Sequence, residues 1–582
     1  MRKSPLSENN IGLSTLLYIG SHRYKSKHFY LDISRSMCYN QNTMRIPLSA
    51  SPTVIGGKWR LYQYFEVNNM ELNNISFGKL KYCENEGEGT VVRYYTDVRE
   101  REYFTYLDTL GDFGYQKREE YSIGPSRVSL FAKDDDMLLC NYFPTVNEAR
   151  IVTEPSSEYL LFSDPTSASR VNAMMTQIDL EDFGTSVVFR LPDGRFIVFD
   201  GGWGFEPDAD KLVKCLADQS DGKTPTVAAW IITHPHCDHY RCFSTAYEKY
   251  QDAFKVERFI YNIADSDEKF YEAIPKLRDE EDELRKFYRC VKATGAKVYR
   301  AHTGQIYKFS GARLEVLASP DDTLVRPVNN MNHLSLIIKM TIVGQTIMMC
   351  ADATLSVAGI AKRYGEYLKS DILQPAHHMF TGGDNETYDL IDPAVCVASG
   401  FEEHCFGNFS TCHRACRDAN LHLLYNLNVQ DFFTGGTGNV ALTLPYTPRA
   451  NGRRLYLDKL DKHRKALGAE SWFFTELTKE DATFCFVNAT YGAAEIYLDL
   501  YCENDSDQMY DDYVHAIKFT IPALSMRRFN VLDTDKVDGD ALYYNPHSLS
   551  KKGVADGAVF SAHFRSSLPI VIKGKKNADY HS

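Results

Sequence analysis

The strongest constraint in the sequence is a run of potential metal ligands at the end of one apolar segment. Residues 233–239 read THPHCDH and follow TVAAWII, which is apolar on both faces, as expected of a buried strand. In extended backbone, residues two apart point to the same side, so His234 and His236 project together. The chain then turns, which lets Asp238 and His239 reach a second position nearby. Imidazole and carboxylate groups bind borderline divalent metals, so this segment predicts a pocket for two ions.

Hydrophobic patterning divides the 582 residues into three predicted domains. Residues 1–165 carry short alternating runs rich in Tyr and Phe, which predict a β-rich domain of unknown role with the strands FYLDIS, WRLYQYFEV, TVVRYYTDV and EYFTYLD. From 166 to 448, apolar strands alternate with helical stretches, which predicts a layered α/β domain. Residues 449–582 return to alternating runs and predict a second β-rich domain, such as a small sandwich.

Charge and hydropathy limit the classes of partner. The chain has 65 Lys and Arg against 77 Asp and Glu, a net charge of −12, which argues against a strong nucleic-acid surface and against a nuclease acting on long DNA. No apolar run of about 18 residues occurs, so neither a membrane span nor a membrane partner is expected. One basic stripe stands out, but acidic residues interleave with it, and it consists of Arg449, Arg453, Arg454, Lys459, Lys462, Arg464 and Lys465.

The cysteines indicate a reducing compartment. All 14 are scattered between Cys38 and Cys502 without the spacing of a disulfide framework, and several lie in apolar runs. Buried free thiols are therefore expected, and with no signal-peptide core near the N-terminus the predicted location is cytoplasmic. The tightest cluster is Cys405, Cys412 and Cys416, where a structural zinc is the minor alternative because Cys-x3-Cys is not a zinc-knuckle spacing.

Beyond the motif, segments between about 175 and 446 resemble the metallo-β-lactamase-fold hydrolases. FRLPDGRFIVFDGG is similar to the opening hairpin of that family and ends at Asp200. QTIMMCADA resembles the strand that delivers a bridging carboxylate, here Asp352, and SDILQPAHHMF resembles the strand that ends in the last histidine ligand. NNMNHLSLIIKM is similar to the Asn-x-x-Ser-Leu-Val strand of one branch. That branch includes the hydrolase domain of DNA-uptake (competence) channel proteins and the phosphorylcholine esterases.

This resemblance implies a four-layer αββα metallo-β-lactamase-type sandwich in the middle of the chain, flanked by the two β-rich domains. It also implies a set of metal ligands: His234, His236, Asp238, His239, Asp352 and one of His377 and His378. Within the doublet His377 is favoured, because it comes first after the strand. Asp352 would bridge both ions, and Asp238 would also accept a proton as the catalytic residue. Asp200 would orient the ligands without binding metal.

Several further positions follow from the same resemblance. Many relatives carry another histidine between the motif and the bridging Asp; here Asn332 occupies that position, and His333 beside it is the candidate for an additional ligand. Ala351 and Met379 stand where the family usually has Gly, a residue that allows close backbone approach, so Met379 is expected to narrow the pocket. Tyr240 and Asn408 are weaker candidates for lining it.

The implied activity is that of a dinuclear metal-dependent hydrolase. Zinc is the favoured metal and manganese the alternative, because His236 stands where the oxygen-reducing diiron relatives have Glu. The favoured reaction is phosphodiester hydrolysis by a metal-bridging hydroxide, acting on a small or oligomeric substrate. The alternative within enzymes is an ester, lactone or amide hydrolase. The alternative of another class is a non-catalytic binding or scaffold protein with a structural metal site. No oligomeric state follows from the sequence.

Overall fold

The computed structural model describes residues 77–87, 89–157, 159, 171–263, 280–322, 330–380, 382–407, 414–449, 456, 470–502, 513–531, 542–543 and 559–575. Several sequence predictions lie outside these residues. They are the strands FYLDIS and WRLYQYFEV, the pocket candidate Asn408, the basic stripe after Arg449, and Cys412 of the cysteine cluster.

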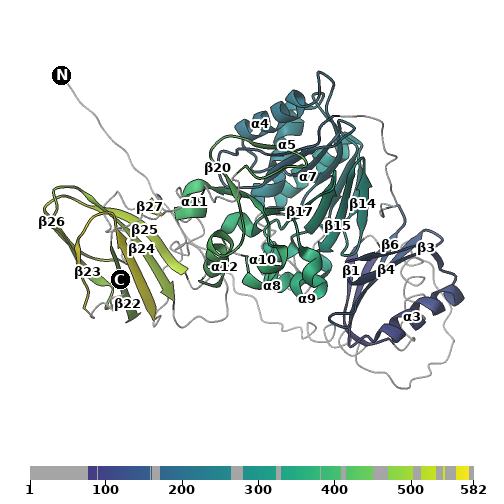
Figure 1. The fold of residues 1–582 in the computed structure, drawn as a ribbon, viewed down its shortest axis with the longest axis horizontal. Coiled ribbons are helices and arrows are strands. Elements are labelled where there is room, and N and C mark those ends of the chain that lie inside the picture. The colour runs from purple at the N-terminus through teal and green to yellow at the C-terminus, as the bar shows by residue number, and fades with distance from the viewer. Residues whose placement is uncertain are drawn as a thin grey trace, which may run out of the picture. The chain divides into compact units, whose positions relative to one another are not determined.

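The described chain begins with a six-stranded antiparallel sheet in the order β1-β2-β6-β5-β4-β3 (Figure 1). Its strands are β1 (Lys79–Gly87), β2 (Thr90–Thr96), β3 (Gln116–Ile123), β4 (Ser126–Lys133), β5 (Asp136–Phe143) and β6 (Glu148–Pro155). Strand β2 confirms the strand predicted from TVVRYYTDV. The β-rich character expected of this part of the chain is therefore confirmed, whereas the domain boundaries at 165 and 448 stay predictions.

The prediction of a fourth strand in this region, at EYFTYLD, is wrong. It lies in helix α3 (Glu100–Thr109), which is followed by a 3₁₀ turn at Leu110–Phe113. The buried residues Tyr103, Tyr106, Leu107 and Leu110 recur every three or four positions, which is the spacing of one helical face. Glu102 also accepts a hydrogen bond from the backbone N–H of Arg99, which satisfies one free donor at the start of the helix. Aromatic content favoured a strand, but the helical spacing of the buried rings decides the structure.

Two sheets form the middle of the chain. The first has the order β13-β12-β10-β9-β8-β7-β21, with β11 paired to β10. It contains β7 (Met174–Gln177), β8 (Ser186–Arg190), β9 (Phe196–Asp200), β10 (Thr226–Ile231), β11 (Lys255–Val256), β12 (Arg258–Tyr261), β13 (Lys297–Arg300) and β21 (Val440–Thr443). The second runs β14-β15-β16-β17-β18-β19-β20. It contains β14 (Ile306–Phe309), β15 (Ala312–Ala318), β16 (Ile337–Ile342), β17 (Gln345–Met349), β18 (Ile372–Gln374), β19 (Val395–Phe401) and β20 (Asp431–Gly435).

Successive residues of these strands enter different cores, which explains their continuous apolar runs. Val187 and Ile197 lie in the core between the two sheets, together with Ile338 and Met349 of the second sheet. Their neighbours in sequence, such as Val188, lie in a core shared with helices α4 (Glu206–Asp218), α5 (Cys237–Tyr250) and α7 (Glu281–Thr294). Side chains of both faces are thus buried.

The second sheet is covered on its other face by the remaining helices. They are α8 (Leu355–Ala358), α9 (Ile360–Tyr364), α10 (Asn385–Ile391), α11 (Glu402–Gly407) and α12 (Arg414–Tyr425), and they share a core with residues such as Met348 and Leu373. Figure 1 shows α4, α5 and α7 grouped on one side of the sheets and α8, α9, α10 and α12 on the other. The predicted four-layer αββα sandwich is therefore confirmed.

The last part of the chain has two antiparallel sheets around one apolar core. The larger, β22-β28-β24-β25-β27, consists of β22 (Glu470–Leu477), β24 (Ala494–Cys502), β25 (Tyr513–Ile521), β27 (Leu542–Tyr543) and β28 (Phe560–Ser566). The smaller, β26-β23-β29, consists of β23 (Thr483–Asn488), β26 (Ser525–Asn530) and β29 (Val571–Lys573). The predicted β-rich module is confirmed as a sandwich. No helix among the described residues is long and apolar enough to cross a membrane.

A buried histidine links the N-terminal sheet to the sandwich of the middle region. His302, which is fully buried after β13, has Nε2 at 2.5 Å from Glu154 on β6 and Nδ1 at 2.8 Å from Asp321 after β15. Burial by itself would lower the pKa of His302, but the carboxylates of Asp321 and Glu154 raise it well above its usual value. The imidazolium form therefore bridges an acid on β6 and an acid in the 3₁₀ turn Pro320–Asp322 that follows β15.

This bridge predicts a pH-dependent contribution to stability. Because the folded pKa of His302 lies above its unfolded value of 6.5, its contribution is complete below that pH and is lost as pH rises through the folded pKa. We expect His302→Gln to lower the free energy of unfolding by about 1–3 kcal/mol at about pH 6, and by less at about pH 9.5. Urea unfolding of both proteins at the two pH values measures this difference. A difference that is constant, or that grows with pH, would contradict the prediction.

Candidate metal centre

The THPHCDH segment forms the turn between β10 and α5. Strand β10 ends at Ile231, and His236 has an extended backbone (φ −86°, ψ 147°) immediately before α5 begins at Cys237. His234 and His236 project together, as their spacing predicts, with Nε2 of the first 2.9 Å from Nδ1 of the second. Asp238 and His239 lie in the first turn of α5, where both are buried.

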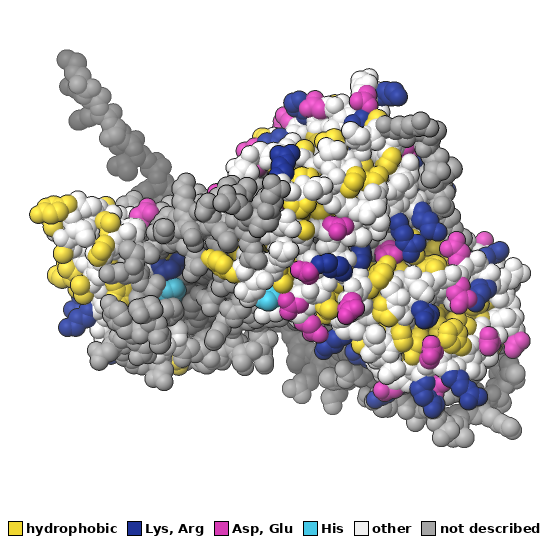
Figure 2. All heavy atoms as spheres, in the orientation of Figure 1, with side chains coloured by type: hydrophobic (Ala, Val, Ile, Leu, Met, Phe, Trp, Pro, Cys, Tyr) yellow, Lys and Arg dark blue, Asp and Glu magenta, His cyan; other side chains and the backbone are white. Residues whose placement is uncertain are grey.

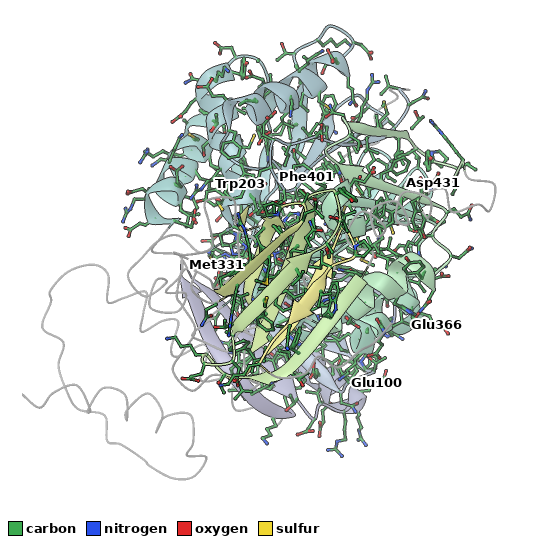
Figure 3. All side chains as sticks on the ribbon, turned by 90° about the vertical axis from the view of Figure 1, so that its left-hand side faces the viewer. Glu100, Trp203, Met331, Glu366, Phe401 and Asp431 are labelled. Atoms are coloured by element: carbon green, nitrogen blue, oxygen red, sulfur yellow. The ribbon has the colours of Figure 1, made fainter. Side chains whose placement is uncertain are left out.

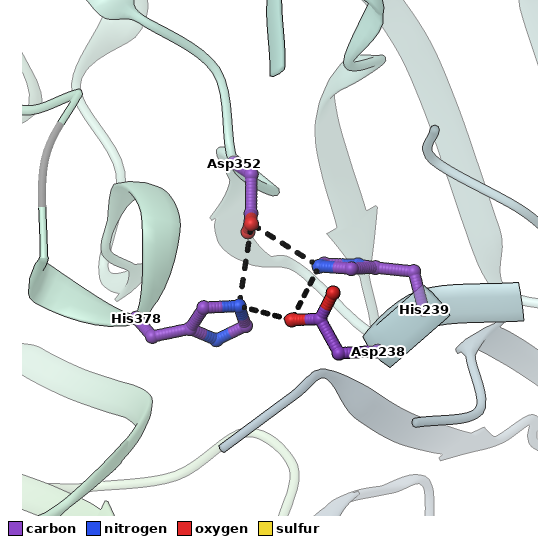
Figure 4. Close-up of side chains that lie close together, drawn as sticks. All are labelled: Asp238, His239, Asp352 and His378. Carbon is purple, nitrogen blue, oxygen red and sulfur yellow. Dashed lines mark hydrogen bonds and ion pairs between the residues drawn. The ribbon is translucent and has the colours of Figure 1, made fainter. Parts of the chain in front are cut away.

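Four side chains from three segments converge beside this turn (Figure 4). Asp238, His239, Asp352 and His378 offer ligand atoms that all lie within 4.8 Å of one another, and all four residues are buried. His378 Nε2 is 3.0 Å from Asp238 Oδ2 and 3.2 Å from Asp352 Oδ2. His239 Nε2 is 3.2 Å from Asp352 Oδ2 and 3.5 Å from Asp238 Oδ2. We call these four residues the second group, because the first group, described next, contains the two earlier histidines of the motif.

His234, His236 and Asp352 form another set within the same distance limit, which we call the first group. Asp352 thus belongs to both groups. Its Oδ2 atom lies 3.8 Å from Nε2 of His234 and 3.6 Å from Nε2 of His377, in addition to the two contacts in the second group. One carboxylate oxygen is therefore surrounded by four imidazole nitrogens.

Asp200 supports the motif from behind. This buried residue ends β9 and accepts hydrogen bonds from the backbone N–H and the hydroxyl of Thr233, both at 2.8 Å. Its Oδ2 atom also lies 2.8 Å from Nδ1 of His239, so Nε2 of that ring faces Asp352. A carboxylate on one ring nitrogen fixes which nitrogen the ring presents, and the orienting role of Asp200 toward a metal stays a prediction.

Strained backbone delivers the remaining side chains. Ala351, His377, His378 and Met379 all have left-handed φ angles, of 48°, 49°, 50° and 66°. A non-glycine residue in this region costs free energy and is retained chiefly where the surrounding structure holds it. Glycine adopts this conformation readily, so Ala351 and Met379 hold it at a cost in free energy that glycine would not have. Gly400 is required for another reason: a Cβ atom there would lie 2.5 Å from the carbonyl oxygen of His378.

The structure separates the two histidines of the doublet. His378 lies in the second group, and its Nδ1 atom is fixed 2.8 Å from the hydroxyl of Ser399 on β19. His377, favoured from sequence order, is in neither group but lies at the edge of both, 3.6 Å from Asp352 and 3.4 Å from the side-chain amide of Asn332. Among the described residues, His333 also lies in neither group.

The charges of the cluster favour a bound cation. Burial opposes ionisation of Asp352 and Asp238, but the neighbouring imidazoles hold the pKa of both carboxyl groups well below the usual value. Burial by itself would lower the pKa of His378. The negative charge of Asp352 outweighs this effect and raises the pKa of His378 to about 9. Without a cation, protonated imidazoles must therefore balance the buried carboxylates. A divalent ion would replace those protons.

The residues present fit divalent metals. Nε2 of His239 and both carboxylate oxygens of Asp352 are buried and make no hydrogen bond of acceptable geometry. Such atoms are costly to bury unless another partner satisfies them. Their short distances to one another show that they point into a shared space. A donor set of imidazole nitrogen and carboxylate oxygen suits borderline divalent metals.

Two aspects of this region differ from or add to the sequence expectations. Tyr240, a candidate for lining the pocket, is fully buried against Phe287 and donates a hydrogen bond to Glu280 at 3.0 Å.

An aromatic row that sequence reasoning missed lies beside His378: Phe183, Phe380, Trp203 and Phe205. Centroid distances of 5.2–5.8 Å connect Phe183 to Phe380, His378 and Trp203, and Trp203 to Phe205. Figure 3 labels Trp203 next to the helical layer that contains α4. Large separations in sequence hide this row.

Comparisons with known proteins add little to this picture. No protein-family model matches the chain, and no curated protein matches its sequence. Among solved structures, a metallo-β-lactamase fold protein of Bacillus subtilis is 10% identical and covers 46% of this chain and 100% of its own, with a TM-score of 0.29. Human tRNase Z, short form, is 13% identical; the match covers 38% of this chain and 91% of the human protein, with a TM-score of 0.23. The Anabaena sensory rhodopsin transducer is 20% identical; the match covers 19% of this chain and 98% of the transducer, with a TM-score of 0.14.

Proposed function

We propose that this protein is a dinuclear metal-dependent hydrolase of the metallo-β-lactamase fold, with a phosphodiester as its substrate. The single observation that carries the proposal is Asp352, which belongs to two groups of ligand-type side chains that are all buried except the half-buried His236. A structural metal site needs only one closed ligand set. Two groups joined by one carboxylate instead match the arrangement in which metals assist hydrolysis.

Each residue of the cluster has a distinct task in this proposal. His234, His236 and Asp352 would hold one ion, and Asp238, His239, Asp352 and His378 would hold the other. When bound, the ions would supply Lewis acidity toward the scissile group and a source of hydroxide at neutral pH. Asp200 and Ser399 hold His239 and His378 through the ring nitrogens that face away from Asp352. Asp238 is the proposed proton acceptor, because it is the ionised carboxylate that belongs to only one group.

The choice of a phosphodiester rests on the resemblance of the segment containing Asn332 and Ser335 to one branch of the family. The side-chain amide of Asn332 lies 3.4 Å from His377, which supports a role for Asn332 at the edge of the cluster. The row Phe183–Trp203–Phe205 beside His378 favours, in addition, a substrate with an apolar group attached to the reacting centre. An ester with an apolar group is therefore the second candidate.

A substrate panel tests the proposal. We expect the zinc- or manganese-loaded protein to hydrolyse bis(p-nitrophenyl) phosphate with a kcat/KM at least about 100-fold above that for p-nitrophenyl acetate or a simple lactone. The Asp352→Ala protein, purified in parallel, should have a kcat/KM lower by about a thousandfold or more, which excludes a contaminating hydrolase. A reversed preference would move the assignment to the ester or lactone class. Full metal loading without any hydrolysis would favour the binding or scaffold protein.

A further inference from the structure

The smaller sheet of the C-terminal sandwich exposes a row of apolar side chains on its outer face. Along β23, Phe484 and Phe486 are buried in the core, so Cys485 and Val487 point to the opposite side. Val487 pairs with Met526 on one neighbouring strand and with Val571 on the other. Met526 is 68% exposed and Val571 is 60% exposed. The row therefore crosses all three strands and faces solvent.

The same end of the sheet carries two more exposed apolar side chains on adjoining loops. Tyr491 is 91% exposed and Leu524 is 64% exposed. The N–H of Leu524 donates to the carbonyl of Thr490 at 3.0 Å, which ties the two loops together. Asn488 braces them from inside, donating to the carbonyls of Gly492 and Ile521 at 2.8 and 3.0 Å. We call Tyr491, Leu524, Met526 and Val571 the apolar tip.

The backbone of Leu524, in the apolar tip, has a conformation that is unusual for its residue type. Its φ angle is 51°, in the left-handed region, where Gly or Asn is the usual residue. The chain accepts this strain at a position that leaves an aliphatic side chain in water. Four of the ten exposed large apolar side chains among the described residues lie in this one place. Clustered exposure of this kind marks an interaction surface, whereas single exposed apolar residues are ordinary.

The charge next to the apolar tip is positive. One row further along the sheet, Cys485 pairs with Arg528 and with Lys573, and both basic residues are exposed. Neither this row nor the row of Val487 contains an acidic residue. Asp481, just before β23, lies at the opposite end and is 3.1 Å from Lys575, and the acid at the tip's own end, Glu495, belongs to β24 of the other sheet. Figure 2 shows apolar side chains gathered on the part of the sandwich that contains β23 and β26, with basic and acidic side chains elsewhere on the sandwich.

We propose that the apolar tip and the row of Arg528 and Lys573 form a docking surface for an anionic lipid membrane. Exposed aliphatic and Tyr side chains insert at the boundary of headgroups and acyl chains, and a row of cations behind them contacts anionic headgroups. A second copy of this chain is a poorer occupant, because the same face would bring like charge to Arg528 and Lys573. The surface is peripheral, so it departs from the expectation of no membrane partner, which rested on the lack of spanning segments. It does not depend on the proposed hydrolase activity.

Vesicle sedimentation with the full-length protein tests the proposal. We expect the wild type to bind vesicles of phosphatidylcholine with about a third phosphatidylserine, and to remain in the supernatant with phosphatidylcholine alone. Leu524→Asn with Met526→Ser should reduce binding at least about tenfold, because buried apolar area drives insertion. A separate variant with Arg528→Gln and Lys573→Gln should reduce vesicle binding at low salt by about fivefold for each charge removed.

Two controls keep the experiment decisive. Leu524→Asn suits the left-handed backbone, so unfolding curves should match those of the wild type. Phe104→Ser removes an apolar side chain of 37% exposure on α3, far from the sandwich in sequence, and should leave vesicle binding unchanged. Equal binding to both kinds of vesicle, or no binding to either, would overturn the proposal. So would a wild-type dimer in light scattering that Met526→Ser converts to a monomer, since the occupant would then be a second copy.

Discussion

Asp352→Ala should lower kcat/KM by about a thousandfold or more, the largest effect on activity expected for any single residue. The reason is that Asp352 alone belongs to both ligand groups, and its Oδ2 atom lies 3.2 Å from both His239 and His378. Its removal would disturb both ions at once. Steady-state kinetics on the best substrate of the panel, with saturating metal, measures the loss.

The matched control is a carboxylate on the protein surface. Asp218→Ala breaks an exposed pair with Lys214 on α4 and should leave kcat/KM unchanged. His378→Ala affects only the second group, so its loss should be smaller than that of Asp352→Ala and should be partly recovered at high metal concentration. An Asp352→Ala protein within tenfold of wild-type activity would contradict the shared role of this carboxylate.

Asp322→Ala should produce the largest loss of stability, about 3–5 kcal/mol in the free energy of unfolding. The side chain of Asp322 is fully buried and lies 3.0 Å from guanidinium nitrogens of both Arg150 and Arg363. Those two side chains are only 2% and 6% exposed, so their charges cannot reach water when the carboxylate is removed. Arg150 would keep Glu148 at 3.2 Å. Arg363 would keep the carbonyl groups of Leu317 and Ala358 and the face of the Phe143 ring, none of which carries a negative charge.

Urea unfolding of both proteins measures this loss, and Asp221→Ala provides the comparison. Asp221 also pairs with an arginine, Arg190, but its side chain is 63% exposed, so its removal should cost less than about 1 kcal/mol. Metal content should not change in either variant. A loss for Asp322→Ala no greater than that for Asp221→Ala would show that the buried network contributes little net free energy.

The features that sequence predicted are those carried by local patterns. The run before His234 is apolar on both faces because β10 lies between two cores, and this pattern is visible in any window of the sequence. The helix at Glu100–Thr109 was misread because its Tyr-rich composition resembles a strand, although its buried residues follow helical spacing. Sequence order favoured His377, but three successive left-handed residues turn the chain so that His378 enters the second group.

The features that sequence could not predict depend on partners that are far apart. His302 lies between Glu154 and Asp321, which are separated from it by 148 and 19 positions, and no local signal marks such a bridge. The aromatic row joins Phe183 to Phe380 for the same reason. The apolar tip depends on cross-strand register, which places Val487 between Met526 and Val571. Each of these features appears only when the chain is folded.

Metal content of the purified protein tests the central claim most directly, by elemental analysis of the wild type, Asp352→Ala and His236→Ala. The proposed dinuclear centre predicts about two zinc or manganese ions per wild-type chain and a lower content in both variants, because each lacks a residue of the first group. A wild-type protein that contains no metal, and takes up none on reconstitution, would contradict the hydrolase assignment.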